Sequence, residues 1–478
     1  MSLRSLSLSL VAALLAAAPL AGAQAKAGPR TGDFKDDCKD KSGAILMHYR
    51  MWAPDKLPEE KLLGLIVWFH GMGGNEDGAG IAIDGTKRAK LGDQYVVMGG
   101  KSKGAGWAPA DDENVLKWIA WAKETYPIDP RRVHIMGHSN GGGMVKRFGW
   151  DHQDLFASIS PYAGAGGGRD FGGTAKGQAR PGKPGAPDSP AETKTEWYFV
   201  HGDKDDAVKV ETSRNCIKDL KEKGYRTVYR EIAGADHGSI FQFADVIEDN
   251  IRFIHSLRHK EIPLSKDEKK KMTELAAKAK TEKGDGIAPV LAEAQRFGGA
   301  PGGHVATVAL ESADPDVKKA AAATAETTLY GREFLAALVK ALKDKNDDIK
   351  PGLYKALGTA ANWRYAEAQD ALIATARNKK APVAERVDAV EGLAKAVKLQ
   401  LLGAYEDKTM IWTLVLLLDD DEVKVQEAAF APLEKAVKDG YDYKPGLSAP
   451  DRKAPLAKWK SWCSDKCGPL EGPAARRS

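Results

Sequence analysis

A serine lies between two glycines in the pentapeptide Gly137-His138-Ser139-Asn140-Gly141. The apolar run 132–136 precedes this pentapeptide and a segment with helical character follows it, so we expect the serine at a strand-to-helix turn. Glycines two residues before and after the serine let the strand and helix approach closely, and the serine hydroxyl is then exposed at the tip of the turn. The pattern predicts a nucleophile elbow, which is typical of serine hydrolases.

A serine hydroxyl is a weak nucleophile at neutral pH, so it needs a base and a third group that orients the base. In hydrolases with an elbow these partners follow the serine in the order acid, then histidine. We predict His237 as the base, because it lies in a glycine-flanked loop directly after an apolar run. His201 comes before the expected acid, and His255 and His259 fall on or just past a predicted helix.

Three aspartates compete for the role of the acid in the segment 201–208, which reads His-Gly-Asp-Lys-Asp-Asp-Ala-Val. The arrangement His-Gly-x-x-Asp-x-x-Val resembles the acid turn of many α/β-hydrolases and selects Asp205. Its carboxylate would hold the tautomer of His237 and stabilise the imidazolium. Asp203 stays as the alternative acid and is otherwise a turn residue, while Asp206 is expected to cap the next helix.

The oxyanion formed during acyl transfer needs hydrogen-bond donors. The apolar run Leu63–Phe69 leads into the glycine-rich segment 70–75, the usual position of an oxyanion loop. We predict the backbone N–H groups of Met72 and Asn140 as the two donors, each contributing about 3 kcal/mol of transition-state stabilisation. The segment 70–75 fits no phosphate-binding pattern.

Two further residues lie near this predicted site. His138 precedes the serine, and we expect its side chain to point away from the serine and to pack. Trp107 follows the apolar run Tyr95–Met98, and two interpretations stay open, a wall of the acyl pocket or a packed core residue. The predicted chemistry requires no metal and no organic cofactor.

The elements that must position these residues follow an α/β pattern between residues 44 and 258, with short apolar runs alternating with helix-length amphipathic segments. Several runs are apolar throughout, as in strands that are buried on both faces of a mostly parallel sheet. The predicted strands are Ile45–Trp52, Leu63–Phe69, Tyr95–Met98, Val133–Met136, Ala157–Ser160, Trp197–Val200 and Val228–Ile232. The predicted helices are Asp112–Thr125, Gly141–Trp150, Lys209–Lys223 and Phe241–Leu257.

The entry to the elbow, Asp129–Gly142, together with the segments 154–158 and 161–164, resembles the polyhydroxybutyrate depolymerases and the feruloyl and acetylxylan esterases. The resemblance covers roughly Ile45–Leu257. It implies an α/β-hydrolase fold, a Ser139-Asp205-His237 triad, and a secreted carboxylesterase acting on small-molecule or polymer-linked esters. The segment 101–107 lacks the longer aromatic run of polymer-degrading members, which favours ester hydrolysis over depolymerisation.

Beyond residue 263 the sequence becomes rich in Ala, Leu, Lys and Asp and has helical periodicity. Acidic turns recur before Val317, Ile349, Val383 and Val423, at spacings of 32, 34 and 40 residues. These spacings lie at or just below the ~40–47 residues of HEAT repeats, which the region resembles. The acidic residues would cap the second helix of each pair. The alternative is an unspecific helical bundle, and a protein or polysaccharide partner fits either interpretation.

Residues 1–25 predict a signal peptide, with Arg4, an apolar stretch from Leu6 to Leu20, and the ending Ala23-Gln24-Ala25. A membrane anchor is the alternative, but the apolar stretch is short, and no later segment is long enough to span a bilayer. We therefore predict a secreted or periplasmic protein. The predicted division is 1–25 signal peptide, 26–262 hydrolase domain and 263–478 helical domain.

The formal net charge of +5 becomes +4 when Arg4 is removed, and basic and acidic residues are intermixed. This argues against a nucleic-acid-binding surface. The glycine- and proline-rich segment Gly164–Pro190 is either a lid over the substrate or a connector.

An even number of cysteines in an exported chain allows disulfides. We predict a pair Cys463–Cys467, which would leave Cys38 to pair with Cys216. A metal site at Cys463 and Cys467 would have too few ligands.

Two other functions stay open at this point. A serine peptidase of the prolyl-oligopeptidase type shares the catalytic geometry, although only about 20 mature residues precede the first predicted strand and leave no room for an N-terminal propeller. The other is a binding or scaffold protein in which the helical repeats recruit a partner and the hydrolase domain is inactive.

Overall fold

The computed structural model describes residues 29–60, 62–164, 194–327, 332–397, 408–437 and 439–469. The predicted signal peptide 1–25 lies outside the described residues, as does nearly all of the candidate lid Gly164–Pro190. No helix within the described ranges has the length and apolar character needed to cross a bilayer.

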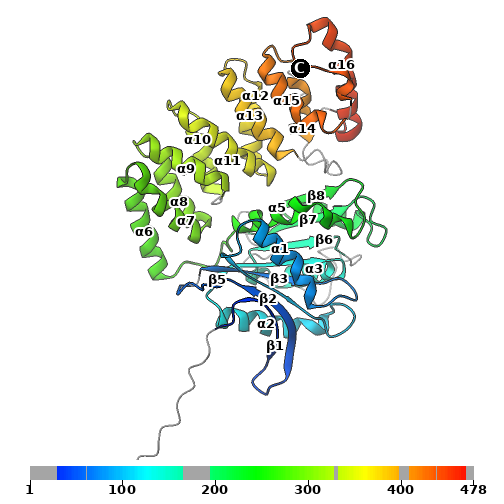
Figure 1. Ribbon diagram of the computed structural model, residues 1–478, viewed down its shortest axis with the longest axis vertical. Helices are drawn as coiled ribbons and strands as arrows, with labels where there is room; N and C mark the ends of the chain where they lie inside the picture. The colour runs from blue at the N-terminus through cyan, green and yellow to red at the C-terminus, as the bar shows by residue number, and fades with distance from the viewer. Residues whose placement is uncertain are drawn as a thin grey trace, which may run out of the picture. The chain divides into compact units, whose positions relative to one another are not determined.

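An eight-stranded sheet forms the first half of the described chain, in the order β1-β2-β4-β3-β5-β6-β7-β8 (Figure 1). β2 pairs antiparallel with both β1 and β4, and all other neighbouring strands are parallel. The strands are β1 (Gly32–Lys39), β2 (Ile45–Ala53), β3 (Leu63–Phe69), β4 (Tyr95–Gly100), β5 (Ile128–His138), β6 (Ser158–Tyr162), β7 (Glu196–Gly202) and β8 (Thr227–Ile232).

Helices cover both faces of this sheet, and the alternation of side chains along the strands separates two apolar cores. Ile66 and Trp68 of β3 belong to the core that α1 and α5 cover, while Leu65 and Val67 belong to the core under α2, α3 and α4. The helices are α1 (Gly80–Arg88), α2 (Asp112–Thr125), α3 (Asn140–Asp151), α4 (Glu211–Glu222) and α5 (Ala244–His255). The predicted α/β-hydrolase fold with a mostly parallel sheet is confirmed.

All seven predicted strands are present, but β1 and α1 were not predicted. β1 carries five charged residues, and Phe34 and Cys38 are its only buried positions. Such a sequence lacks the apolar run that identifies a central strand, and charge is common on the edge strands of sheets.

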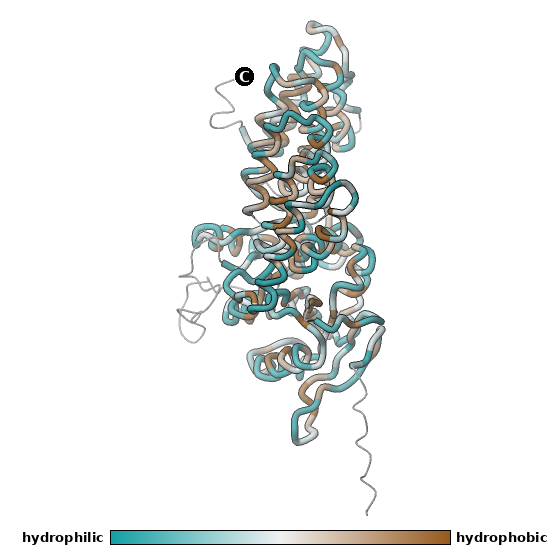
Figure 2. Tube along the Cα trace, turned by 90° about the vertical axis from the view of Figure 1, so that its left-hand side faces the viewer, coloured by the Kyte–Doolittle hydropathy of each residue, from teal (hydrophilic) through white to brown (hydrophobic). Residues whose placement is uncertain are grey.

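The second half of the described chain is helical. α9, α11, α13 and α15 pack in succession, and α6, α8, α10, α12 and α14 do the same in a second row. Hydrophobic and hydrophilic residues alternate along these helices (Figure 2). The helices are α6 (Lys266–Thr281), α7 (Ile287–Phe297), α8 (Gly299–Leu310), α9 (Pro315–Thr327), α10 (Arg332–Ala341), α11 (Lys350–Asn362), α12 (Ala366–Arg377), α13 (Val383–Ala396), α14 (Lys408–Leu417), α15 (Val423–Glu434) and α16 (Ala449–Cys467).

An acidic turn caps the second helix in the expected manner at one of the four predicted positions. Asp314 Oδ1 accepts hydrogen bonds from the N–H groups of Asp316 (2.9 Å) and Val317 (3.4 Å) at the start of α9. Asp420 Oδ1 accepts from the N–H of Glu422 (3.0 Å), the residue before α15, but no side chain caps this helix. α13 instead follows Pro382 without a side-chain cap. The assignment to the HEAT class stays a prediction.

A buried polar cluster joins the turn after α11 to the hydrolase sheet. The Asp249 carboxylate of α5 accepts hydrogen bonds from the Tyr198 hydroxyl of β7 (2.6 Å), Arg230 Nη2 of β8 (2.9 Å) and Asn362 Nδ2 of α11 (2.7 Å). Arg230 Nη2 also donates to the Asn362 carbonyl (2.8 Å). The edge of the sheet therefore contacts the helical half through a network in which each buried polar group has a partner.

The structure forms neither predicted disulfide, and none of its four cysteines is oxidised. Cys38 lies on β1 at one edge of the sheet, whereas Cys216 lies on α4, which packs on β8 at the opposite edge. Cys463 and Cys467 are one turn apart on α16, where the thiols contact each other. Residues four apart on a helix have Cβ atoms about 5–6 Å apart, farther than a disulfide allows.

Candidate active site

Ser139 occupies the sharp turn between β5 and α3. Its backbone has φ 56° and ψ −118°, a conformation that costs a non-glycine residue free energy and persists only where the surrounding structure enforces it. The Ser139 N–H donates to the Tyr162 carbonyl at the end of β6 (2.9 Å), which holds the turn against the neighbouring strand. Among the described residues the Ser139 hydroxyl has no hydrogen-bond partner.

The two glycines of the pentapeptide are required by close backbone contacts. A Cβ atom on Gly137 would lie 2.6 Å from the Gly141 carbonyl oxygen, and a Cβ atom on Gly141 would lie 2.1 Å from the Phe69 carbonyl oxygen. Both distances are far below van der Waals contact. The spacing of glycines in the sequence is therefore the spacing at which β5, α3 and the end of β3 approach one another.

The structure brings Asp205 and His237 together. Asp205 follows β7, its side chain is fully buried, and its Oδ2 lies 2.7 Å from Nδ1 of His237 in the loop after β8. A carboxylate can only accept, so Nδ1 carries the proton and Nε2 of the neutral ring is free to act as a base. The His237 side chain is 25% exposed, which leaves this base accessible.

The two other aspartates of the acid turn have different positions. Asp203 Oδ1 accepts a hydrogen bond from the N–H of Gly234 (2.6 Å) and so braces the loop that carries His237. Asp206 is exposed and pairs with Lys209. The expected helix cap is absent, because α4 begins only at Glu211, beyond the reach of Asp206.

Asp236 also holds the loop. Its Oδ1 accepts from the N–H groups of Gly238 (3.0 Å) and Ser239 (2.8 Å), and hydrogen bonds from Ser239 in particular lower the pKa of this carboxyl group. Two aspartates thus fix the loop that presents His237: Asp203 from the turn after β7, and Asp236 from within the loop.

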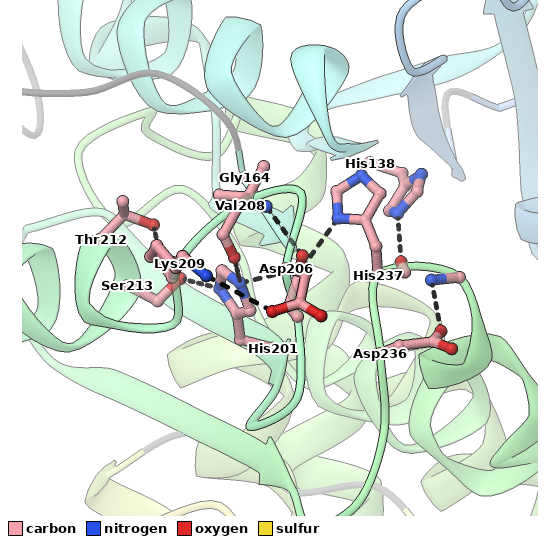
Figure 3. A network of polar contacts seen from close by, with 12 residues as sticks. His138, Gly164, His201, Asp206, Val208, Lys209, Thr212, Ser213, Asp236 and His237 are labelled. Atoms are coloured by element: carbon pink, nitrogen blue, oxygen red, sulfur yellow. Dashed lines mark hydrogen bonds and ion pairs between the residues drawn. The ribbon is translucent and has the colours of Figure 1, made fainter.

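The side chain of His138 packs, as expected from the sequence, and its partner is the ring of His237 (Figure 3). The ring centroids are 4.7 Å apart, and His138 Nε2 donates to the His237 carbonyl (2.9 Å). Burial lowers the pKa of His138 to about 4, so the ring is neutral at physiological pH. His138 therefore connects the serine turn to the His237 loop. No hydrogen bond joins Ser139 to His237 within the described chain, and such bonds often tighten only when substrate is bound.

The predicted oxyanion donors flank the serine. Asn140 is the first residue of α3, so its N–H has no acceptor within the helix and lies at the positive end of the helix dipole. Met72 follows β3, its side chain is 65% exposed, and no backbone carbonyl of the described residues accepts its N–H. A Cβ atom on Gly71 would lie 3.3 Å from Ser139 Cβ, so this loop runs alongside the serine.

Trp107 is a core residue and does not line an open pocket. Its side chain is 6% exposed, and its ring packs at right angles to Phe69, with centroids 4.9 Å apart. The backbone N–H of Trp107 donates to Asn140 Oδ1 (2.6 Å). The Asn140 side chain therefore fixes the loop after β4, a contact that no local sequence pattern indicates.

His201 precedes the acid in the chain, yet it contacts the acid directly. Its Nε2 lies 3.1 Å from Asp205 Oδ2, and its ring is fully buried. The sequence feature that indicates this contact is the position of His201 in the same turn, four residues before Asp205. Within the described ranges no group of His, Cys, Asp and Glu side chains is arranged to hold a metal ion.

No family model matches the sequence, and no curated protein matches it. Solved structures resemble about half of the chain. A thermostable esterase is 21% identical over 47% of this chain and 63% of its own, with a TM-score of 0.37. The S-formylglutathione hydrolase of Staphylococcus aureus is 15% identical (48% and 97%, TM-score 0.37), and a ferulic acid esterase of Anaeromyces mucronatus is 16% identical (45% and 89%, TM-score 0.34). At these values the likeness says nothing about reaction or substrate.

Proposed function

We propose that this chain is an exported serine hydrolase that cleaves carboxylic esters through an acyl-enzyme. The observation that supports this most strongly is the hydrogen bond between the buried Asp205 carboxylate and His237 Nδ1, next to a serine held in a strained turn. A buried carboxylate, a partly exposed imidazole and a partly exposed serine in this order are the parts that nucleophilic catalysis by serine requires.

In the proposed reaction, Ser139 Oγ attacks the ester carbonyl carbon while His237 Nε2 takes the hydroxyl proton. The N–H groups of Asn140 and Met72 donate to the resulting oxyanion. The C–O bond to the alcohol then breaks, and His237 gives its proton to the leaving alkoxide oxygen. Water attacks the acyl-enzyme in the same way, with His237 as base, and releases the carboxylic acid and Ser139.

Asp205 stays ionised through both steps in this mechanism. It accepts the Nδ1–H of His237 and stabilises the imidazolium that forms each time the ring takes a proton. All groups come from this chain, and the proposed reaction uses no cofactor.

Ester substrates are proposed from the resemblance of the elbow segment Asp129–Gly142 to feruloyl and acetylxylan esterases. The test is a comparison of turnover with p-nitrophenyl acetate, feruloyl methyl ester and aminoacyl p-nitroanilides. We expect hydrolysis of the two esters. Cleavage of the anilides alone would contradict the ester assignment and favour a peptidase.

The serine mechanism is tested by labelling with a fluorophosphonate probe, which reacts with activated serine hydroxyls. We expect stoichiometric labelling of the wild type and none of Ser139→Ala. An unlabelled but folded wild type would favour a binding protein without catalytic activity. Export is tested separately, by expressing the full chain in a bacterial host and determining whether the N-terminus of periplasmic protein follows residue 25.

A further inference from the structure

His201 is a buried histidine beside the site to which the proposed mechanism gives no role. It is the second-last residue of β7, and both of its ring nitrogens have partners (Figure 3). Nδ1 lies 2.7 Å from the Ser213 hydroxyl of α4, and Nε2 lies 2.8 Å from the Val208 carbonyl. A carbonyl can only accept, so Nε2 carries the proton, and Nδ1 accepts from Ser213. Burial lowers the pKa of His201, which keeps the ring neutral in this tautomer.

The contacts of His201 form a closed ring with Asp205. His201 Nε2, whose proton is donated to the Val208 carbonyl, also lies 3.1 Å from Asp205 Oδ2. The N–H of the same Val208 donates to Asp205 Oδ1 (2.7 Å). His201 thus contacts one carboxylate oxygen and holds the residue that binds the other. Rotation of the carboxylate would break one of these contacts or the hydrogen bond to His237.

From this geometry we propose that His201, anchored by Ser213, is the positioning residue that fixes the Asp205 carboxylate in the plane where Oδ2 accepts the Nδ1–H of His237. This role deepens the proposed function and rests on it. His201 itself touches no substrate and transfers no proton. Its loss lets the carboxylate turn away from His237, which lowers the rate of acylation while substrate binding is unchanged.

The chain offers a matched control for this role. His134 of β5 is also fully buried and also pairs with a serine, with Nδ1 2.8 Å from the Ser158 hydroxyl of β6. It has no contact with Asp205. A substitution at His134 therefore removes a buried histidine–serine hydrogen bond of the same kind and leaves the contacts of Asp205 unchanged.

The experiment measures kcat and KM with p-nitrophenyl acetate, and the rate of fluorophosphonate labelling, for His201→Phe, His201→Gln, His134→Phe and His134→Gln. We expect His201→Phe to lower kcat and the labelling rate by roughly 10- to 100-fold at unchanged KM, the scale on which outer partners of functional groups act. His201→Gln, whose amide can donate to Val208 and Asp205, should recover much of this loss. Both His134 variants should keep the wild-type kcat.

Three results would overturn the proposal. The first is a wild-type kcat in folded His201→Phe, and the second is a loss in His201→Gln as large as in His201→Phe. The third is an equal loss in His134→Phe, which would indicate a general effect of disturbing the sheet. If His201→Phe does not fold, Ser213→Ala against Ser158→Ala makes the same comparison. These results leave the serine mechanism intact, whereas an unlabelled wild type would overturn the mechanism and this role together.

Discussion

Two histidine clusters lie on the same sheet, and their surroundings differ. The Asp205 cluster consists of His138, His201 and His237 around the carboxylate at the carboxyl ends of β5, β7 and β8. Here His237 has an acidic acceptor at Nδ1 and partial exposure, and the other two histidines hold its loop and its acid.

The Arg132 cluster consists of Arg132, His134, His255 and Arg258, farther from the carboxyl end of β5. Arg132 Nη2 lies 3.2 Å from His255 Nδ1, and Arg258 donates to the His255 carbonyl (3.0 Å). Burial lowers the pKa values of His134 and His255 well below the ordinary range, and the charge of Arg132 lowers them further. No carboxylate of the described residues pairs with either arginine.

In the Arg132 cluster, burial and the charge of Arg132 keep both His134 and His255 neutral. The capacity for base catalysis comes from a carboxylate at Nδ1 combined with access at Nε2, and the Arg132 cluster has neither. Its histidines pack and hydrogen-bond within the sheet. Substitutions in the two clusters should therefore separate effects on activity from effects on stability.

The largest difference in kcat is expected between substitutions of two serines, one in each cluster region. Ser139→Ala removes the nucleophile and should lower kcat for p-nitrophenyl acetate by about six orders of magnitude, the loss seen when a serine hydrolase loses its serine. Ser158→Ala, which removes the hydroxyl beside His134, should keep kcat within a few-fold of wild type. Substantial turnover by Ser139→Ala would show that another group attacks the ester.

The next effect concerns the acid. Asp205→Asn would present an amide to His237 and favour the wrong tautomer, so kcat should fall by about 10⁴-fold. Asp203→Asn, which keeps a hydrogen-bond acceptor for the N–H of Gly234, is the matched variant and should lose far less. If Asp203→Asn lost more activity than Asp205→Asn, the carboxylate roles would be reversed.

The sequence predicted the features of this site that depend on local backbone. The glycines around Ser139 are required because a Cβ atom at either position would lie 2.1–2.6 Å from a backbone oxygen. The apolar runs identify the buried strands. The chain order of acid and base was likewise sufficient to choose Asp205 and His237, which the structure places in contact.

What the sequence did not predict depends on the spatial order of distant segments. The side-chain directions of His138 and His201 matter because β5, β7 and β8 end at the same edge, which no local pattern encodes. The predicted disulfide between Cys38 and Cys216 was wrong for the same reason. The strand order places β1, which carries Cys38, at the edge opposite to β8, on which the helix with Cys216 packs. β1 itself has too much charge to be recognised from an apolar pattern.

A smaller effect should come from His138, the neighbour of the serine. His138→Phe keeps an aromatic ring on His237 but removes the hydrogen bond to its carbonyl, so the loop can shift relative to Ser139. Because reactions of this kind are sensitive to displacements of about 1 Å, we expect roughly a tenfold fall in kcat. His255→Phe in the Arg132 cluster should leave kcat unchanged, and equal losses in the two variants would contradict the separation of the clusters.

The smallest effect concerns the pH dependence of the unfolding free energy, which His138 should share with the Arg132 cluster. The pKa of His138 is about 4 in the folded chain, against 6.5 as the ordinary value. Between these values the unfolded chain binds a proton that the folded chain does not, so the free energy of unfolding falls as the pH drops from 6.5 to 4. His138 contributes up to about 3 kcal/mol of this fall.

His138→Phe and His134→Phe should therefore each show a weaker dependence of unfolding free energy on pH than wild type, measured by urea denaturation between pH 4 and 7.5. His304→Gln, at an exposed histidine, is the control. Curves parallel to wild type in both phenylalanine variants would mean that these histidines take up protons in the folded chain. A flatter curve for both, with kcat reduced only in His138→Phe, would show that burial is common to the two clusters and catalysis is not.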